Sequence, residues 1–251
     1  MFLFRTATRF RPPLLFVPRI IALLSLLIIH PVTAGDSKDN TTGSSTDSTV
    51  ADIDGNIYHC VRIGDQVWMV ENLKVTRYRD GSPIEYISDD TAWSLTNWGA
   101  YCWYEDDSLA YNGTYGAFYN FYAVVDSRGL APAGWHIPTW GEWLALEAYL
   151  GGQDVAGGKL KATGAAHWIE PNTGATDQYG FRGLPAGGRG QITGCGDMGG
   201  YATWWSSTSY DSLFAWHYGL SYDKARVRRN PGHKASGFSV RCVKDKSTAA
   251  E

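Results

Sequence analysis

The sequence predicts an α+β domain with an antiparallel sheet, and three observations support this fold class. A strand pattern opens the domain near residue 57, a well-capped helix pattern covers 139–150, and short strand-like runs separated by glycine follow Gly180. Strands that are segregated from helices are typical of α+β proteins, whereas a parallel βαβ array would alternate the two. We find no internal repeat in the sequence.

The first 34 residues are expected to be a cleaved signal peptide and not part of the fold. A basic stretch precedes an apolar run over 20–29, and Val32-Thr33-Ala34 supplies the small residues of a cleavage site. The basic residues are Arg5, Arg9, Arg11 and Arg19. A membrane anchor is the alternative, but Pro18 and Arg19 interrupt the apolar stretch, and about 20 apolar residues are needed to span a bilayer. No cysteine follows the cleavage site, so a lipoprotein is not expected.

The rest of the chain is expected to contain a linker, one domain and a short tail. Residues 35–51 are rich in Ser, Thr, Asp and Gly, which predicts a flexible polar linker. The domain would span 52–245, and 246–251 would form the tail. Loss of the leader removes four arginines and no acid, so the formal net charge would change from −3 to −7. Such an acidic chain has no electrostatic reason to bind nucleic acid or an anionic membrane.

A hairpin and two helices are expected in the first half of the domain. Asp54-Gly55 predicts a turn, residues 57–63 alternate as in a strand, and Gly64-Asp65 returns the chain into 67–70. Apolar residues at helical spacing predict a helix over 115–125. A second helix over 139–150 has a stronger signal, because Thr139 and Glu142 form a capping box at its start.

The second half is expected to contain a long loop followed by short strands. The loop, over 151–179, is polar and glycine-rich, and loops of this length inside a domain are often functional. The expected strands are 181–184, 203–206, 215–221, 225–228 and 238–243.

The four cysteines are Cys60, Cys102, Cys195 and Cys242. An even number of cysteines in an exported chain favours disulfides, and four cysteines allow three pairings. The sequence has no C-x-x-C motif and no His/Cys cluster, so it does not predict a structural zinc site.

Aromatic residues are unusually frequent, with 11 tryptophans and 15 tyrosines. Most of them are expected to fill the core. Trp204 and Trp205 are adjacent in a predicted strand, so one should face inward and the other outward. Trp93, Trp98 and Trp168 stand in polar, loop-like contexts and are expected to be exposed. Because rigid aromatic rings stack well on sugar rings, they favour a glycan ligand.

A series of motifs resembles the Fibrobacter succinogenes major paralogous domain. The motifs are DIDGN (52–56), IGDQVWM (63–69), ENL (71–73), AYCWY (100–104), YNFYAV (119–124), GWHIP (134–138), EW (142–143), GF (180–181), LP (184–185), WWSST (204–208), AW (215–216) and GFSVRCVKD (237–245). The resemblance covers about 52–245, and many motifs in register make it specific.

The resemblance implies an exported bacterial protein with a layout similar to C-type-lectin-like and formylglycine-generating-enzyme-like domains. In such folds the first and last strands pair, which implies Cys60–Cys242 and Cys102–Cys195 disulfides. Formylglycine-type catalysis requires a pair of reactive cysteines near the closing strands. Only Cys242 lies there, so catalysis of this kind is not expected.

Two polar segments resemble parts of calcium sites. Glu170-Pro171-Asn172 matches the tripeptide with which mannose-type C-type lectins bind calcium and sugar, and Asp177 could add a further oxygen ligand. A surface turn is the alternative for this tripeptide. Asp52-x-Asp54-Gly-Asn56 resembles half of a calcium loop, but no glutamate follows at the required distance, so a polar turn is expected.

The sequence therefore favours an exported or cell-surface module that binds glycan or polysaccharide. The alternatives are a protein–protein adhesion or scaffold domain and an extracellular enzyme. His136 and His167 lack nucleophiles or paired carboxylates nearby in sequence, so we expect structural roles and no catalysis. No cofactor is expected apart from calcium at the Glu170 loop. The expected ligand-binding residues are Trp93, Trp98, Trp168, Glu170, Asn172 and Asp177.

Overall fold

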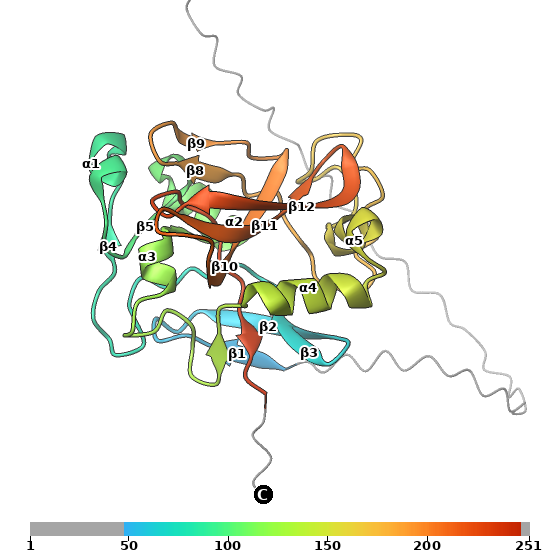
Figure 1. The fold of residues 1–251 in the computed structure, drawn as a ribbon, viewed down its shortest axis with the longest axis horizontal. Helices are drawn as coiled ribbons and strands as arrows, with labels where there is room; N and C mark the ends of the chain where they lie inside the picture. The colour runs from blue at the N-terminus through green and yellow to red at the C-terminus, as the bar shows by residue number, and fades with distance from the viewer. Residues whose placement is uncertain (1–47, 247–251) are drawn as a thin grey trace, which may run out of the picture. The chain divides into compact units, whose positions relative to one another are not determined.

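The computed structural model describes residues 48–246, which form a mixed α+β domain (Figure 1). The predicted leader (1–34) and most of the predicted linker and tail lie outside the described residues. Within 48–246, no helix is both long and apolar enough to cross a membrane.

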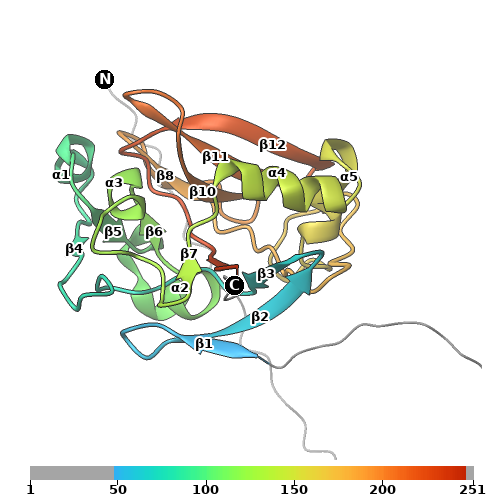
Figure 2. The same cartoon turned by 60° about the horizontal axis from the view of Figure 1, so that its bottom comes forward.

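A five-stranded sheet has the order β1-β2-β3-β13-β7. Its strands are β1 (Thr49–Ala51), β2 (Ile57–Ile63), β3 (Gln66–Met69), β7 (Trp135–His136) and β13 (Val243–Lys244). The predicted hairpin is confirmed as β2 and β3. The closing strand β13 lies between β3 and β7 (Figure 2), so the two ends of the domain meet in one sheet. Because β1 pairs with β2, regular structure begins inside the predicted linker 35–51.

A three-stranded antiparallel sheet has the order β10-β11-β12. Its strands are β10 (Tyr201–Ser209), β11 (Phe214–Ser221) and β12 (Lys224–His233). They contain the predicted runs 203–206, 215–221 and 225–228 and extend beyond them. The smaller sheets are formed by β4 (Glu85–Tyr86), β5 (Ala100–Cys102) and β6 (Phe118–Tyr119), and by β8 (Gly188–Gly190) with β9 (Gly194–Gly196).

Two predicted strands are wrong over most of their length. Gly183 in 181–184 makes a single bridge to Lys161. In 238–243 only Val243 belongs to a strand, because Phe238 bridges Tyr119 while Ser239 bridges Trp204. The segment crosses from one sheet to another, so no single partner strand accompanies it.

The helices are α1 (Asp90–Leu95), α2 (Ser108–Tyr115), α3 (Phe121–Val124), α4 (Trp140–Tyr149) and α5 (Gln153–Leu160), with a 3-10 turn over Tyr104–Asp106. Helix α4 begins with the predicted capping box of Thr139 and Glu142. The prediction of one continuous helix over 115–125 is wrong, because only Tyr115 and Phe121–Val124 are helical. Gly116 adopts φ 75°, which ends α2, and β6 follows before α3. Helix α5 was not predicted and occupies the first part of the loop 151–179.

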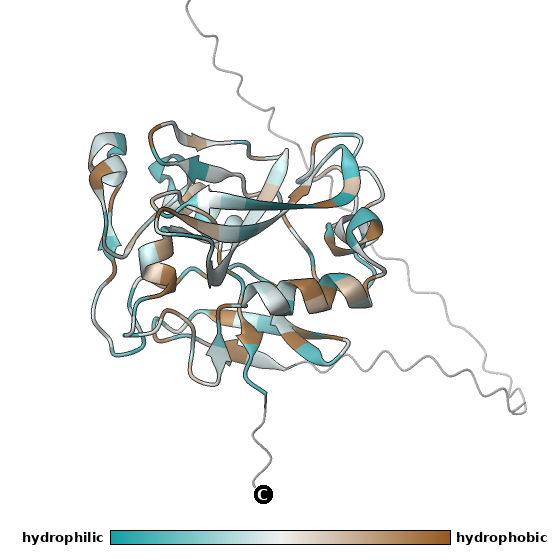
Figure 3. Ribbon diagram, in the orientation of Figure 1, coloured by the Kyte–Doolittle hydropathy of each residue, from teal (hydrophilic) through white to brown (hydrophobic). Residues whose placement is uncertain are grey.

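Helix α4 lies between the two larger sheets (Figure 3). Its buried residues are Trp143, Leu146 and Glu147. The Trp143 ring stacks on Tyr218 of β11 at a centroid distance of 4.5 Å and contacts Trp68 of β3 at 4.7 Å. One side chain thus joins both sheets.

Trp204 and Trp205 are both fully buried, so the prediction of one outward-facing ring is wrong. The rings do lie on opposite faces of β10, where Trp204 packs beside Trp143 and Trp205 packs against Phe121 and Phe238. Both faces of the sheet are covered at this point.

All four cysteines are free, so neither predicted disulfide is present in the structure, and the Cys60–Cys242 pairing is wrong. Cys60 and Cys242 lie on either side of Met69 of β3, which separates their backbones by two strand spacings, about 10 Å. A disulfide requires Cα atoms within about 7 Å. Cys102 and Cys195 do meet, and the Cys102 thiol hydrogen-bonded to Cys195 lowers the pKa of Cys195 to about 7.

Candidate functional site

A cavity with a volume of about 580 Å³, called the polar pocket, lies where five chain segments meet. Volumes of about 300–1,000 Å³ are typical of small-molecule sites. Residues 70–72 follow β3, Thr114 comes from α2, and the other lining residues lie in the loop after α5 and just before β13. Its charged and polar side chains include Glu71, Asn72, His167, Asp177, Arg182 and Arg241.

The floor of the polar pocket is a buried hydrogen-bond network centred on Asn72. The Asn72 amide oxygen accepts hydrogen bonds from Arg241 Nη2 at 2.9 Å and from Trp204 Nε1 at 2.8 Å. Its amide nitrogen donates to the Tyr115 carbonyl at 2.9 Å and to Ser239 Oγ at 3.3 Å. Since both ends of the amide are engaged, the network fixes its orientation.

Arg241 is 1% exposed and is held between aromatic rings. Its guanidinium lies 4.2 Å from the Phe181 ring centroid and donates to the Phe181 carbonyl. Burial lowers the pKa of Arg241, while the charges of Glu71 and Asp177 raise it. A guanidinium remains protonated at neutral pH, so the floor carries a fixed positive charge.

Asp177 and Arg182 form one wall of the polar pocket. Both residues adopt positive φ angles, 45° and 53°, in the turn that joins them. Asp177 Oδ1 accepts a hydrogen bond of 2.7 Å from the Arg182 backbone N–H. Burial raises the pKa of Asp177, although that hydrogen bond and the charges of Arg182 and Arg241 oppose the rise. Within 48–246 the Arg182 side chain makes no hydrogen bond or ion pair, so its N–H groups are available to a ligand.

Glu71 and His167 stand at other edges of the polar pocket. Glu71 accepts hydrogen bonds from the His59 backbone N–H at 2.8 Å and pairs with the His59 ring at 2.7 Å. His167 Nδ1 lies 3.1 Å from the Tyr115 hydroxyl. The pocket therefore presents carboxylate acceptors beside guanidinium and imidazole groups.

The structure brings only one of the predicted ligand-binding residues, Asp177, into the polar pocket. Trp93 and Trp168 are each 1% exposed, so the prediction that they are exposed is wrong. Their indole N–H groups donate to the carbonyls of Ala235 and Gly183, which satisfies the polar atom of each buried ring. Trp98 is 49% exposed as predicted, but it does not line this pocket.

The three residues predicted to bind calcium, Glu170, Asn172 and Asp177, do not converge on one cavity. Asn172 Nδ2 donates to the carbonyls of Ala162 and Gly164, both at 3.0 Å, so this amide braces the loop. Glu170 and Asn172 do not line the cavity that contains Asp177. Two guanidiniums act on Asp177, and nearby positive charge disfavours a divalent cation. Calcium at these residues remains a prediction of the sequence.

Two further predictions concern Asp52 and His136. Asp52 Oδ1 accepts from the backbone N–H groups of Asp54 and Asn56, so the segment forms the expected polar turn. His136 bridges two carboxylates, with Nε2 2.9 Å from Glu142 and Nδ1 2.6 Å from Asp245. It therefore links α4 to the end of the domain, a structural role.

Sequence reasoning did not identify Glu71, Arg182 and Arg241 as site residues. Arg241 carried a usable signal, because it stands between Val240 and Cys242 in an apolar run, and a charge in such a run is rarely buried without partners. Glu71 and Arg182 carried none, since nothing in the spacing of 71, 182 and 241 indicates that they meet.

One comparison with known proteins identifies a family. The family model described as the Fibrobacter succinogenes major domain matches residues 61–244, most of the chain. No curated protein and no solved structure matches the sequence.

Proposed function

The chain belongs to the Fibrobacter succinogenes major domain family, and we propose that it is an exported or cell-surface module that binds a glycan or polysaccharide in the polar pocket. The observation that carries this proposal is the mixture of hydrogen-bonding groups around one cavity. The proposal includes no catalytic step.

A sugar hydroxyl both donates and accepts hydrogen bonds, so a sugar needs both kinds of partner within a small space. Asp177 and Glu71 supply acceptors, and Arg182 supplies donors. The Asn72–Arg241 network holds the floor in one arrangement, which reduces the entropy cost of ordering the site on binding.

We also infer a C-type-lectin-like arrangement for the domain. Support comes from β13 beside β3, which brings the ends of the domain together, and from the long loop after α5 that contributes to the polar pocket. Likeness of fold says little about the ligand, so the function rests on the pocket itself.

A glycan array probed with the purified protein and with Asp177→Asn tests the proposal. Asparagine keeps the shape of the side chain and tolerates the positive φ, so the turn should persist. Loss of a charged acceptor should weaken binding by about 10-fold or more, because hydrogen bonds to charged groups contribute about 1.5–3 kcal/mol. Asp154→Asn is the matched control, because Asp154 is 85% exposed on α5.

The array should be run with calcium and again with a chelator. Binding that the chelator leaves unchanged and that Asp177→Asn weakens would locate recognition in the polar pocket without a metal. Binding that the chelator abolishes would instead support the Glu170, Asn172 and Asp177 calcium prediction. If no glycan binds in either condition, the glycan proposal is wrong.

A protein-binding module without a small ligand is the second candidate. Apolar side chains at the β10–β11 turn favour it, because Tyr210 and Leu213 are 54% and 57% exposed. The Tyr210 ring contacts Trp216 at a centroid distance of 4.9 Å, and the Trp216 ring stacks on Trp140 at 4.6 Å. If this candidate is correct, a co-purifying protein should be lost from the Tyr210→Ser, Leu213→Ser double variant while glycan binding stays absent.

A further inference from the structure

A second cavity, called the hairpin pocket, has a volume of about 450 Å³ and shares no lining residue with the polar pocket. It lies between the β8–β9 hairpin and one face of the β10–β11–β12 sheet. The hairpin side is lined by glycines, among them Gly188, Gly190, Gly194 and Gly196. The sheet side presents Thr203, His217 and Arg228, one residue from each strand.

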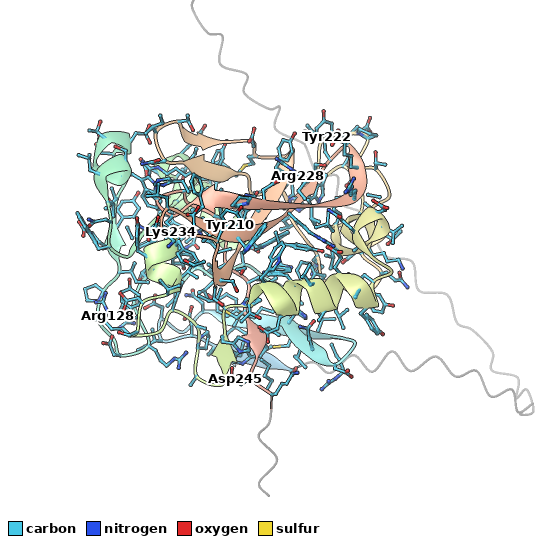
Figure 4. All side chains as sticks on the ribbon, in the orientation of Figure 1. Arg128, Tyr210, Tyr222, Arg228, Lys234 and Asp245 are labelled. Carbon is cyan, nitrogen blue, oxygen red and sulfur yellow. The ribbon has the colours of Figure 1, made fainter. Side chains whose placement is uncertain are left out.

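Arg228 of β12, labelled in Figure 4, lines the hairpin pocket and, among the described residues, supplies its unpaired positive charge. Its guanidinium lies 4.6 Å from the ring centroid of Tyr201, so the aromatic face orients it while its N–H edges remain open. Within 48–246, the Arg228 side chain forms no ion pair. Arg189 also lines the pocket, but its guanidinium already donates to Ile87, Ser88 and Asp90.

His217 lies beside Arg228 on the same face of the sheet, and its Nδ1 atom is buried without a hydrogen-bond partner in residues 48–246. Burial, together with the charge of Arg228, lowers the pKa of His217 to about 4. The ring is therefore neutral at neutral pH, with one nitrogen that donates and one that accepts. It can hydrogen-bond a ligand without a charge of its own.

The central row of the sheet leaves room between these groups. Thr203 and Arg228 stand opposite Gly219 on either side, and glycine brings no side chain into the space between them. A Cβ atom added to Gly196 would meet nothing within 4 Å, so the hairpin wall is also open there. Asp197 and Thr203 add an acceptor carboxylate and a hydroxyl to the lining.

We propose that the hairpin pocket binds a sugar acid, with the carboxylate held by Arg228 and the hydroxyls held by Thr203, His217 and Asp197. A planar carboxylate matches the open edge of a stacked guanidinium. Asp197 would repel a second carboxylate, which limits the ligand to one acid group at this site. The choice of a sugar as the carrier of the carboxylate rests on the proposed function, whereas the site itself does not.

The test compares binding of D-galacturonate and D-galactose, measured by NMR titration at fixed ionic strength. The two probes differ by a carboxylate in place of a hydroxymethyl group. We expect galacturonate to bind the hairpin pocket and Arg228→Gln to weaken that binding about 10-fold or more. Gly196→Leu should weaken it as well by filling the cavity. Arg226→Gln is the matched control, because Arg226 lies on the same strand but pairs with Asp154 of α5.

Each outcome separates the site from its alternatives. Equal weakening by Arg226→Gln would mean a general charge effect and would overturn the proposal. Full binding by Arg228→Gln would do the same. If Asp177→Asn abolishes galacturonate binding while Arg228→Gln does not, the ligand occupies the polar pocket, and only the hairpin site is wrong. If acetate binds as well as galacturonate, the sugar part of the proposal is wrong.

Discussion

On the face of the β10–β11–β12 sheet that meets α4 and α5, the buried side chains are large and apolar, whereas the opposite face carries Thr203, His217 and Arg228. We call these the helix face and the open face. Trp204, Tyr218 and Leu220 on the helix face are at most 1% exposed. Pairs of residues on one strand, such as Trp204 and Trp205, divide between the two faces. On the open face only the part near Trp205 is packed into the core, where that ring contacts Phe121 and Phe238. The helix face therefore supports the fold, whereas the open face can hold a ligand around Thr203 and Arg228.

The largest effect is expected from Trp143→Ala, which removes the ring that joins the helix face to the five-stranded sheet. Large-to-small changes of a buried tryptophan cost about 3–5 kcal/mol through lost burial and the cavity left behind. Thr203→Ala on the open face should change stability by at most about 0.5 kcal/mol. Urea unfolding of both variants measures the difference. Similar losses in the two would contradict the division between the faces.

The helix face was more accessible to sequence reasoning than the open face. The Thr139–Glu142 capping box and the strand runs at 203–206 and 215–221 are local patterns, and the structure confirms them. The prediction for 115–125 was wrong because apolar spacing outweighed Gly116, whose positive φ ends the helix. Exposure of Trp93 and Trp168 was also wrong, since polar neighbours in sequence do not reveal what packs over a ring from a distant segment.

The two pockets could not be derived in the same way. Asp177 was identified from its loop. Its companion Arg182 stands five residues later in the same turn, whereas Glu71 and Arg241 come from distant places in the chain. Arg228 and His217 likewise meet only because β11 and β12 pair in a particular register. Side chains that converge through tertiary structure leave no periodic signal in the sequence.

The next largest effect is expected from Asn72→Ala, at the border between the helix face and the polar pocket. The change leaves the Trp204 indole N–H and a buried guanidinium, Arg241, without their shared acceptor. The loss of a partner by buried polar and charged groups should destabilise the domain by about 3 kcal/mol. Asn230→Ala on the open face is the control, with an expected change within about 0.5 kcal/mol. Thermal and urea unfolding measure the stability of both variants. If the two lose the same stability, the Asn72 network does not stabilise the domain.

Replacing two helical glycines by alanine is expected to have smaller effects on stability, and the two effects should have opposite signs. A Cβ atom at Gly157 of α5 would lie 2.6 Å from the Ala225 carbonyl oxygen of β12, so Gly157→Ala should cost about 1–2 kcal/mol. Gly113 of α2 has nothing within 4 Å of an added Cβ atom. Gly113→Ala should therefore stabilise the domain by about 0.5–1 kcal/mol through helix propensity. Urea midpoints measure both changes. A higher midpoint for Gly157→Ala would show that α5 is not tightly packed against β12, and a lower midpoint for Gly113→Ala would contradict the expected gain in helix propensity.

The smallest effect concerns the charges that hold the start of α4. The hydrogen bond to Glu142, and to a smaller extent the one to Asp245, raises the pKa of His136 above its unfolded value. Asp245 is labelled in Figure 4. The folded state therefore binds more protons than the unfolded chain, and the resulting stability is complete below about pH 6.5 and is lost as the pH rises through the folded pKa. Because the His136 side chain is 36% exposed, solvent screening should limit the change to under about 1 kcal/mol.

His136→Gln should remove this decline, and urea unfolding at several pH values from 6.5 upward measures it. The pH range matters because His217 on the open face contributes with the opposite sign. Its lowered pKa makes the folded state bind fewer protons than the unfolded chain between about pH 4 and 6.5, so its contribution rises with pH in that window and is constant above it. If the free energy of unfolding of His136→Gln still declines above pH 6.5, the decline comes from another group. The link between α4 and the end of the domain would then not depend on the charge of His136.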